Sequence, residues 1–103
     1  MATPVFSGWT RLTASGVVGD SGKAQWIAGY SVESGAGGAA IPYFINGTGT
    51  TGTIVFRGSG GATSSGGTIQ QVGQLPVSFY SGCYVSFDAN TTAVSVFYTQ
   101  ALT

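Results

Sequence analysis

Residues 83–100 read CYVSFDANTTAVSVFYTQ, two runs of alternating side chains on either side of a turn. A period of two places alternate side chains on opposite faces of a β-strand, so each run has one apolar face for a core. The intervening residues 88–92, DANTT, are types that form turns, which predicts a hairpin between the two strands. The apolar faces are Cys83, Val85 and Phe87 in the first strand and Val94, Val96 and Tyr98 in the second.

The rest of the chain repeats this pattern of short β-prone runs separated by glycine-rich turns. The clearest run is residues 25–33, and its heavier face consists of Trp26, Ala28, Tyr30 and Val32. Pro42 cannot donate a hydrogen bond to a neighbouring strand, so the run around it is predicted at a sheet edge or beside a bulge. The predicted strands are residues 9–18, 23–34, 39–46, 53–58, 67–72, 75–80, 83–89 and 93–100.

Seven or eight short strands at roughly 10-residue spacing, without a helical period, predict an all-β fold, an antiparallel β-sandwich or small jelly roll. A chain of 103 residues has room for one such domain. Residues 1–8, MATPVFSG, carry no charged side chain, and Pro4 holds its neighbours extended, so we predict an extended N-terminal arm there. The single β-sandwich domain is expected over residues 9–103, with a flexible surface loop at residues 59–67.

Ionisable side chains are scarce, because the chain has three basic and three acidic residues, no histidine and one cysteine. The net charge is zero, which removes the electrostatic attraction that draws basic proteins to nucleic acids and anionic membranes. No apolar run approaches the ~20 residues of a membrane span, and Met1 is followed by Ala-Thr-Pro rather than by a signal peptide. We therefore expect no nucleic-acid partner, no membrane partner, and synthesis in a cytoplasm.

The same residues leave little room for catalysis or metal binding. Without histidine, neither a Ser-His-Asp nor a Cys-His arrangement can form, and Cys83 on an apolar face is predicted to be a core residue. Asp20 and Asp88 lie in turn sequences and Glu33 at a strand end, so no catalytic, cofactor-binding or metal-binding residue is predicted. A calcium ion held by Asp20, Asp88 and backbone carbonyls stays open as an alternative.

A surface with so few charges is poorly protected against association, because small soluble domains usually carry a net charge of magnitude ~2 to 8. The composition therefore favours a protein that is covered by copies of itself or by a larger assembly. Tyr and Trp suit such interfaces because each has an apolar body and a polar tip. The predicted interface residues are Pro4, Val5, Phe6, Trp9 and Tyr43.

Three segments of the chain resemble a known group of proteins. They are SGVVGDSGKAQWIAGYSVESGAGG (15–38), IPYFINGTGTTGTIVF (41–56) and SGCYVSFDANTTAVSVFYTQ (81–100). Together they resemble short glycine-rich β-sandwich virion proteins of tailed bacteriophages, and most of all the capsid decoration (cement) proteins. The resemblance implies a structural protein without enzymatic activity, a homo-oligomer expected to be a trimer, which lies on the capsid surface across junctions of the major capsid protein.

We therefore expect a capsid decoration protein that stabilises the phage head. Two alternatives stay open. One is a tail-fibre or knob component that binds a host glycan and uses Tyr43, Tyr80 or Tyr84 as stacking platforms for a sugar ring. The other is a carbohydrate-binding module. A small hydrolase is the least favoured interpretation, since the chain lacks the side chains that hydrolysis needs.

Overall fold

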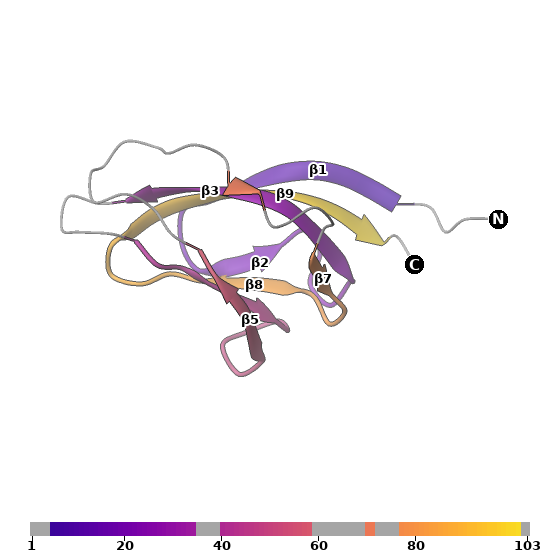
Figure 1. Cartoon of the computed structure of the whole chain (residues 1–103). Coiled ribbons are helices and arrows are strands. Elements are labelled where there is room, and N and C mark those ends of the chain that lie inside the picture. The colour runs from indigo at the N-terminus through magenta and orange to yellow at the C-terminus, as the bar shows by residue number, and fades with distance from the viewer. Residues whose placement is uncertain (1–4, 35–39, 59–69, 72–76, 102–103) are drawn as a thin grey trace.

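The computed structural model of this chain describes residues 5–34, 40–58, 70–71 and 77–101 (Figure 1). These residues form nine strands, and all of their pairings are antiparallel. The predicted loop at residues 59–67 lies outside the described residues. The strands are β1 (Val5–Leu12), β2 (Gly16–Val18), β3 (Gln25–Ser34), β4 (Tyr43–Asn46), β5 (Thr53–Arg57), β6 (Gln70–Gln71), β7 (Val77–Phe79), β8 (Cys83–Ser86) and β9 (Thr91–Ala101).

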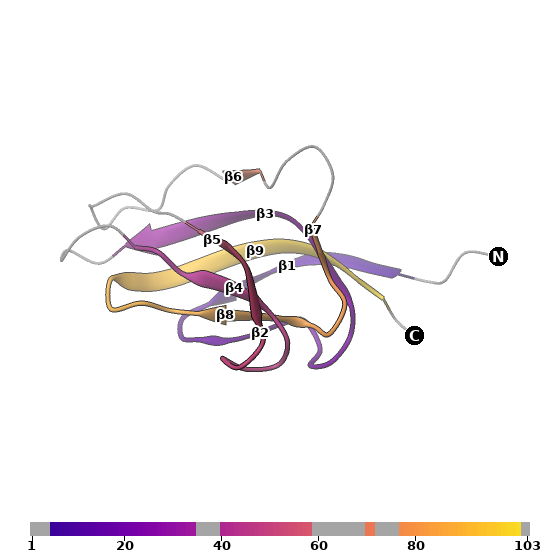
Figure 2. The ribbon, with the colours of Figure 1, turned by 60° about the horizontal axis from the view of Figure 1, so that its bottom comes forward.

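The strands form two sheets packed face to face as a sandwich, which confirms the predicted fold class. The β9 sheet has the order β1-β9-β3, followed by β6 and β7, and the β8 sheet has the order β2-β8-β4-β5. Both β6 and β7 pair with the same strand, β6 at Gly29 and Tyr30 and β7 at residues 25–27. β6 and β7 therefore lie one after the other along the same side of β3, and together they act as one interrupted edge strand. Figure 2 brings the β8 sheet toward the viewer.

The strand pairs are nested along the chain, as in a rolled-up hairpin. The first strand pairs with the last (β1 with β9), the second with the next to last (β2 with β8), then β3 with β6 and β7, and finally β4 with β5. When β6 and β7 count as one strand, this is the order of an eight-stranded jelly roll. The nesting means that strands close in sequence often lie in different sheets.

Two predicted local connections are therefore wrong. The run 9–18, predicted as one strand, turns at Thr13–Ser15, and its two halves enter opposite sheets as β1 and β2. The segment 88–92, predicted as a hairpin turn, instead carries the chain from β8 in one sheet to β9 in the other. The turn at Thr13–Ser15 was not recognised from the sequence. The turn residues at 88–92 were recognised, but a turn sequence does not say whether the chain returns beside its own strand or crosses to the facing sheet.

The N-terminal segment also differs from the prediction. Strand β1 begins at Val5, and all eight of its residues pair with β9, from Val5 opposite Ala101 to Leu12 opposite Val94. Residues 5–8 are therefore part of the sandwich rather than an arm, because the edge of β9 offers partners for their backbone N–H and C=O groups. Residues 1–4, including Pro4, lie outside the described residues.

The core lies between the sheets and is centred on aromatic rings. The Phe44 and Phe56 rings stack with centroids 4.4 Å apart and planes 16° apart, and the Tyr30 ring lies 5.2 Å from that of Phe44. Cys83, Val85, Val94, Val96 and Tyr98 are buried as predicted. The buried cluster consists of Val18, Ile27, Tyr30, Val32, Ala40, Phe44, Phe79, Cys83, Val85, Val94, Val96 and Tyr98.

A β-bulge in β3 changes which side chains face the core. The register of β3 against β9 shifts between Ile27 and Gly29, so Ala28 has no partner of its own. Before the bulge the buried residues are Gln25 and Ile27, and after it they are Tyr30 and Val32. The predicted heavier face is therefore correct for Tyr30 and Val32 and wrong for Trp26, because the extra residue reverses the alternation.

Pro42 lies in the chain immediately before β4 rather than within the strand. Its carbonyl oxygen accepts a hydrogen bond from Gly58 N–H at 2.7 Å, and its missing N–H removes nothing from a sheet. β4 itself lies between β8 and β5, so it is not an edge strand. The alternative prediction, a position beside a bulge, agrees with the register shift of β4 against β5 between Phe44 and Ile45.

A buried amide network fastens the β2–β3 turn to the end of β9. The Gln100 side-chain oxygen accepts hydrogen bonds from Gln25 Nε2 and from Asp20 N–H, each at 2.7 Å. The Gln100 Nε2 group donates to the Asp20 carboxylate at 3.0 Å. Gly19, with φ of 65°, approaches this network so closely that a Cβ there would lie 2.4 Å from the Gln100 oxygen. The turn therefore needs glycine at this position.

Candidate interaction surface

The outer face of the β8 sheet, which points away from the core, carries a row of apolar side chains. Val17 lies opposite Tyr84, Tyr84 opposite Ile45, and Ile45 opposite Ile54 across the four strands. Ile45 is only 2% exposed, although it does not belong to the core cluster between the sheets. This sheet therefore has apolar side chains on both of its faces, whereas a sheet with one solvated face shows alternation of apolar and polar residues.

A second row on the same face combines an aromatic ring with a cation. Tyr43 lies opposite Arg57 on one side and Ser86 on the other. The guanidinium carbon of Arg57 is 5.0 Å from the centroid of the Tyr43 ring, a cation–π contact that holds the Arg57 side chain over the sheet. Within the described part of the chain, Arg57 forms no ion pair with a carboxylate. Its charge is therefore available to an external carboxylate.

A second bulge brings further apolar side chains to the surface. The register of β4 against β5 shifts between Phe44 and Ile45, which leaves Val55 without a partner of its own. Ile41, Ile54 and Val55 are each between 39% and 45% exposed. We define the β4–β5 patch as Ile41, Tyr43, Ile54, Val55 and Arg57.

A pocket of about 160 Å³ adjoins this patch and is lined by Ile41, Tyr43, Ser86, Phe87 and Asp88. The Asp88 carboxylate is held in place, because it accepts hydrogen bonds from the Ile41 N–H at 3.2 Å and from the Thr91 hydroxyl. The pocket thus offers one carboxylate, two hydroxyl groups and two aromatic rings. It has the composition of a small polar site with apolar walls.

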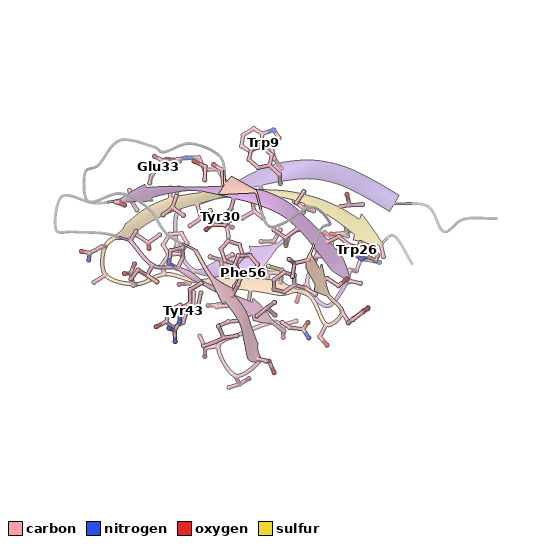
Figure 3. All side chains as sticks on the ribbon, in the orientation of Figure 1. Trp9, Trp26, Tyr30, Glu33, Tyr43 and Phe56 are labelled. Atoms are coloured by element: carbon pink, nitrogen blue, oxygen red, sulfur yellow. The ribbon has the colours of Figure 1, made fainter. Side chains whose placement is uncertain are left out.

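The predicted interface residues do not form one surface. Trp9 is 63% exposed on the outer face of the β9 sheet, whereas Tyr43 lies on the outer face of the β8 sheet, on the opposite side of the sandwich (Figure 3). Val5 and Phe6 belong to β1, and Pro4 lies outside the described residues. The structure thus separates Trp9 from Tyr43 and indicates two surfaces rather than one.

An ion pair lies on the same outer face as Trp9. Arg11 Nε and a terminal nitrogen of its guanidinium donate to the two Glu33 oxygens at 2.9 and 3.0 Å. The hydrogen bond from Arg11 lowers the pKa of Glu33, and the same bond together with the Glu33 charge raises the pKa of Arg11. Arg11 is thus paired with a carboxylate of its own chain.

Several other candidate groups are kept apart. Tyr80, 76% exposed, lies in the turn before β8, and Tyr43 lies opposite Ser86 at the other end of that strand. Asp20 comes shortly after Val18, which pairs with Cys83 at the start of β8, whereas Asp88 follows the end of β8. The two carboxylates therefore lie near opposite ends of this strand and do not share a calcium ion. Burial raises the pKa of Cys83 to about 12, which makes it a core residue rather than a nucleophile.

The sequence contains one signal for the β4–β5 patch that alternation of apolar and polar residues does not reveal. Residues 54–56 are three consecutive apolar residues, Ile-Val-Phe, in a short strand. Strict alternation can turn only one side of such a run to the core, so at least one of the three must face outward. Neither the bulge at Val55 nor the stacking of Arg57 on Tyr43 can be read from that run alone.

Comparison of the chain with protein-family models, with curated proteins and with solved structures finds no match. In the described segments there is no helix long and apolar enough to cross a membrane.

Proposed function

We propose that this chain is a virion structural protein, a capsid decoration protein of a tailed bacteriophage that associates with itself and binds the major capsid protein. The observation that carries the proposal is the apolar outer face of the β8 sheet, with the β4–β5 patch at its exposed side. Jelly rolls occur in viral capsid proteins, among other functions, so the fold supports the proposal by analogy only. In this proposal the protein lies on the capsid surface.

The β4–β5 patch has the chemistry of a protein-binding surface. Ile41, Ile54 and Val55 provide exposed apolar area, and Tyr43 with Arg57 provides the residue types enriched at binding hot spots. The capsid surface that fits it is apolar and carries a carboxylate within reach of the guanidinium. This charge complementarity favours the major capsid protein over a nucleic acid as the occupant, because one arginine makes no basic patch.

The expected binding is mainly apolar, with a single charged contact. Raising the salt concentration screens one ion pair but leaves apolar burial intact. We therefore expect particle binding to weaken only slightly between low and physiological salt. A nucleic-acid ligand would instead lose affinity steeply over the same range.

The test measures how much protein binds to isolated shells of the major capsid protein from the phage that encodes this chain. Ile54→Asp introduces a charge into the patch and should lower occupancy at least tenfold while the protein remains folded. The matched control is Tyr80→Asp, at a more exposed position outside the patch, which should bind like the wild type. Wild-type occupancy by Ile54→Asp, or failure of the wild type to coat shells, would overturn the proposal.

One observation favours a second candidate, binding of a host glycan by a tail-fibre or knob component or by a carbohydrate-binding module. The pocket beside Tyr43 combines aromatic rings with the fixed Asp88 carboxylate, a pairing that suits the apolar face and the hydroxyls of a sugar. Glycan-array binding that is lost in Asp88→Ala, without any binding to shells, would support this function in place of decoration.

A further inference from the structure

The two sheets have four edges, and three of them are protected against pairing with another chain. β2 has three residues, and the edge formed by β6 and β7 consists of strands of two and three residues. β5 carries the bulge at Val55 and ends at Arg57. Short strands, bulges and charged residues are the features by which β-proteins prevent edge-to-edge association.

β1 has none of these protections within its described length. It pairs with β9 over eight consecutive residues without a register shift, and it contains neither proline nor bulge. No described strand pairs with its other side. Its one charged residue, Arg11, is already neutralised by Glu33 of the same chain. The unpaired backbone groups along this edge are therefore accessible to another strand without a charge to oppose it.

We propose that β1 pairs antiparallel with β1 of a second copy of this chain, around a two-fold axis that passes between the two Trp9 residues. The inference deepens the self-association in the proposed function and rests on it. The two β9 sheets then become one continuous sheet through the dimer. The same strand serves as both donor and acceptor, as an isologous two-fold interface requires.

The register follows from the side-chain faces. Residues directly opposite each other in an antiparallel pair lie on the same face, so the two residue numbers of each pair must add to an even number. Leu12 packs against the core cluster, whereas Trp9 lies on the outer face. Placing Trp9 opposite Trp9 keeps these faces continuous and pairs seven residues of each strand, residues 6–12.

One other register pairs as many residues, with Gly8 opposite Gly8. It places two residues without side chains at the centre, whereas the Trp9 register places two aromatic rings there, the kind of cross-strand pair that stabilises sheets. Registers centred closer to either end of β1 pair fewer residues. The register centred on Arg11 also places two like charges opposite each other. The Trp9 register is therefore the one that the strand favours.

A second copy fits this edge better than an unrelated strand. The net charge of the chain is zero, so two copies do not repel each other. Trp9, 63% exposed in the single chain, becomes covered by its own symmetry mate. The resulting unit is a dimer, in place of the trimer that the resemblance to decoration proteins implies.

The test is disulfide crosslinking of full-length protein under mild oxidation. Trp9→Cys should give a covalent dimer, since opposite Cα atoms in an antiparallel pair are ~4.5 to 5.5 Å apart, within the range of a disulfide. Thr10→Cys is the matched control, because Thr10 lies opposite Gly8 of the partner and should stay uncrosslinked. Cys83 is buried and does not compete. Equal crosslinking of both variants, or preferential crosslinking of Thr10→Cys, would overturn the proposal.

A second measurement needs no cysteine. Sedimentation should give a dimer mass for the wild type and a monomer mass for Trp9→Lys, which sets two positive charges opposite each other, while Tyr80→Lys should stay dimeric. A wild-type monomer or trimer, or a dimeric Trp9→Lys, refutes the β1 pairing. The two proposals fail separately: a trimer that coats shells refutes only the pairing, whereas a dimer that never coats shells refutes only the decoration function.

Discussion

Replacing Gln100 with alanine tests whether the buried amide network holds the end of the sandwich together. The substitution removes two hydrogen bonds that the Gln100 oxygen accepts and one that its nitrogen donates. Asp20 is exposed and can turn to water, but Gln25 is fully buried and its Nε2 group loses its partner. An unpaired buried donor costs about 1–3 kcal/mol.

The lost packing adds to this cost. Alanine lacks the Gln100 Cγ methylene, worth about 0.8 kcal/mol when buried, and the lost hydrogen bond from Gln100 Nε2 to the Asp20 carboxylate adds about 0.5–1.5 kcal/mol. We therefore expect the free energy of unfolding to fall by about 2–5 kcal/mol, out of a total of about 5–15 kcal/mol for a domain. The melting temperature should drop by roughly 10–30 °C.

Urea unfolding followed by tryptophan fluorescence measures this change. Two variants serve as comparisons. Ser95→Ala, on the outer face of β9, should change the free energy of unfolding by less than about 0.5 kcal/mol. Gln25→Leu should cost less than about 1 kcal/mol, because the Gln25 side-chain oxygen is buried without a partner among the described residues and leucine removes that unpaired group. A loss below about 0.5 kcal/mol in Gln100→Ala would refute the reasoning.

Three further outcomes follow from individual residues. Gly52→Ala should destabilise the protein by about 1–3 kcal/mol in urea unfolding, since its Cβ would lie 2.2 Å from the Asn46 carbonyl oxygen, whereas Gly49→Ala, with open space around it, should not. Burial raises the pKa of the Cys83 thiol to about 12, so a thiol reagent at pH 8 should label it only as fast as the protein unfolds. The pKa of Glu33 is lowered below its ordinary value of 4.5, so its stabilising contribution is present above that pH and is lost as the pH falls through the folded pKa. In Glu33→Gln this part of the acid dependence of the melting temperature should disappear, and an unchanged dependence would contradict the role of the ion pair.

The strand content and the core face of several strands could be predicted because they depend on local alternation. Val94, Val96 and Tyr98 are buried in β9, which pairs with β1 from Val94 to Ala101 without a register shift, so a period of two is enough to identify them. The same reasoning fails for Trp26, since the bulge at Ala28 lies between it and Tyr30. A bulge is set by how two strands match across the sheet, and no single strand's sequence contains that information.

The interaction surface was predictable only in kind. A chain with few charges and exposed aromatics indicates binding through apolar contact, and Trp9 is exposed as that interpretation requires. Trp9 and Tyr43 lie on separate surfaces, because β1 and β4 enter opposite sheets, and the role of each in an interface stays a prediction. The β4–β5 patch depends on the bulge at Val55 and on Arg57 meeting Tyr43 across two strands.

Composition and local pattern already determine that this chain is an all-β protein with a buried thiol at Cys83 and few groups that could carry out chemistry. These are properties of short segments, because turn residues and alternating runs act over a few neighbours. The assignment of each strand to a sheet, the reversal of β3 at its bulge and the unprotected edge of β1 exist only in the folded molecule. They arise from contacts between segments far apart in the chain, where several pairings satisfy the same local preferences and only packing of the whole selects one.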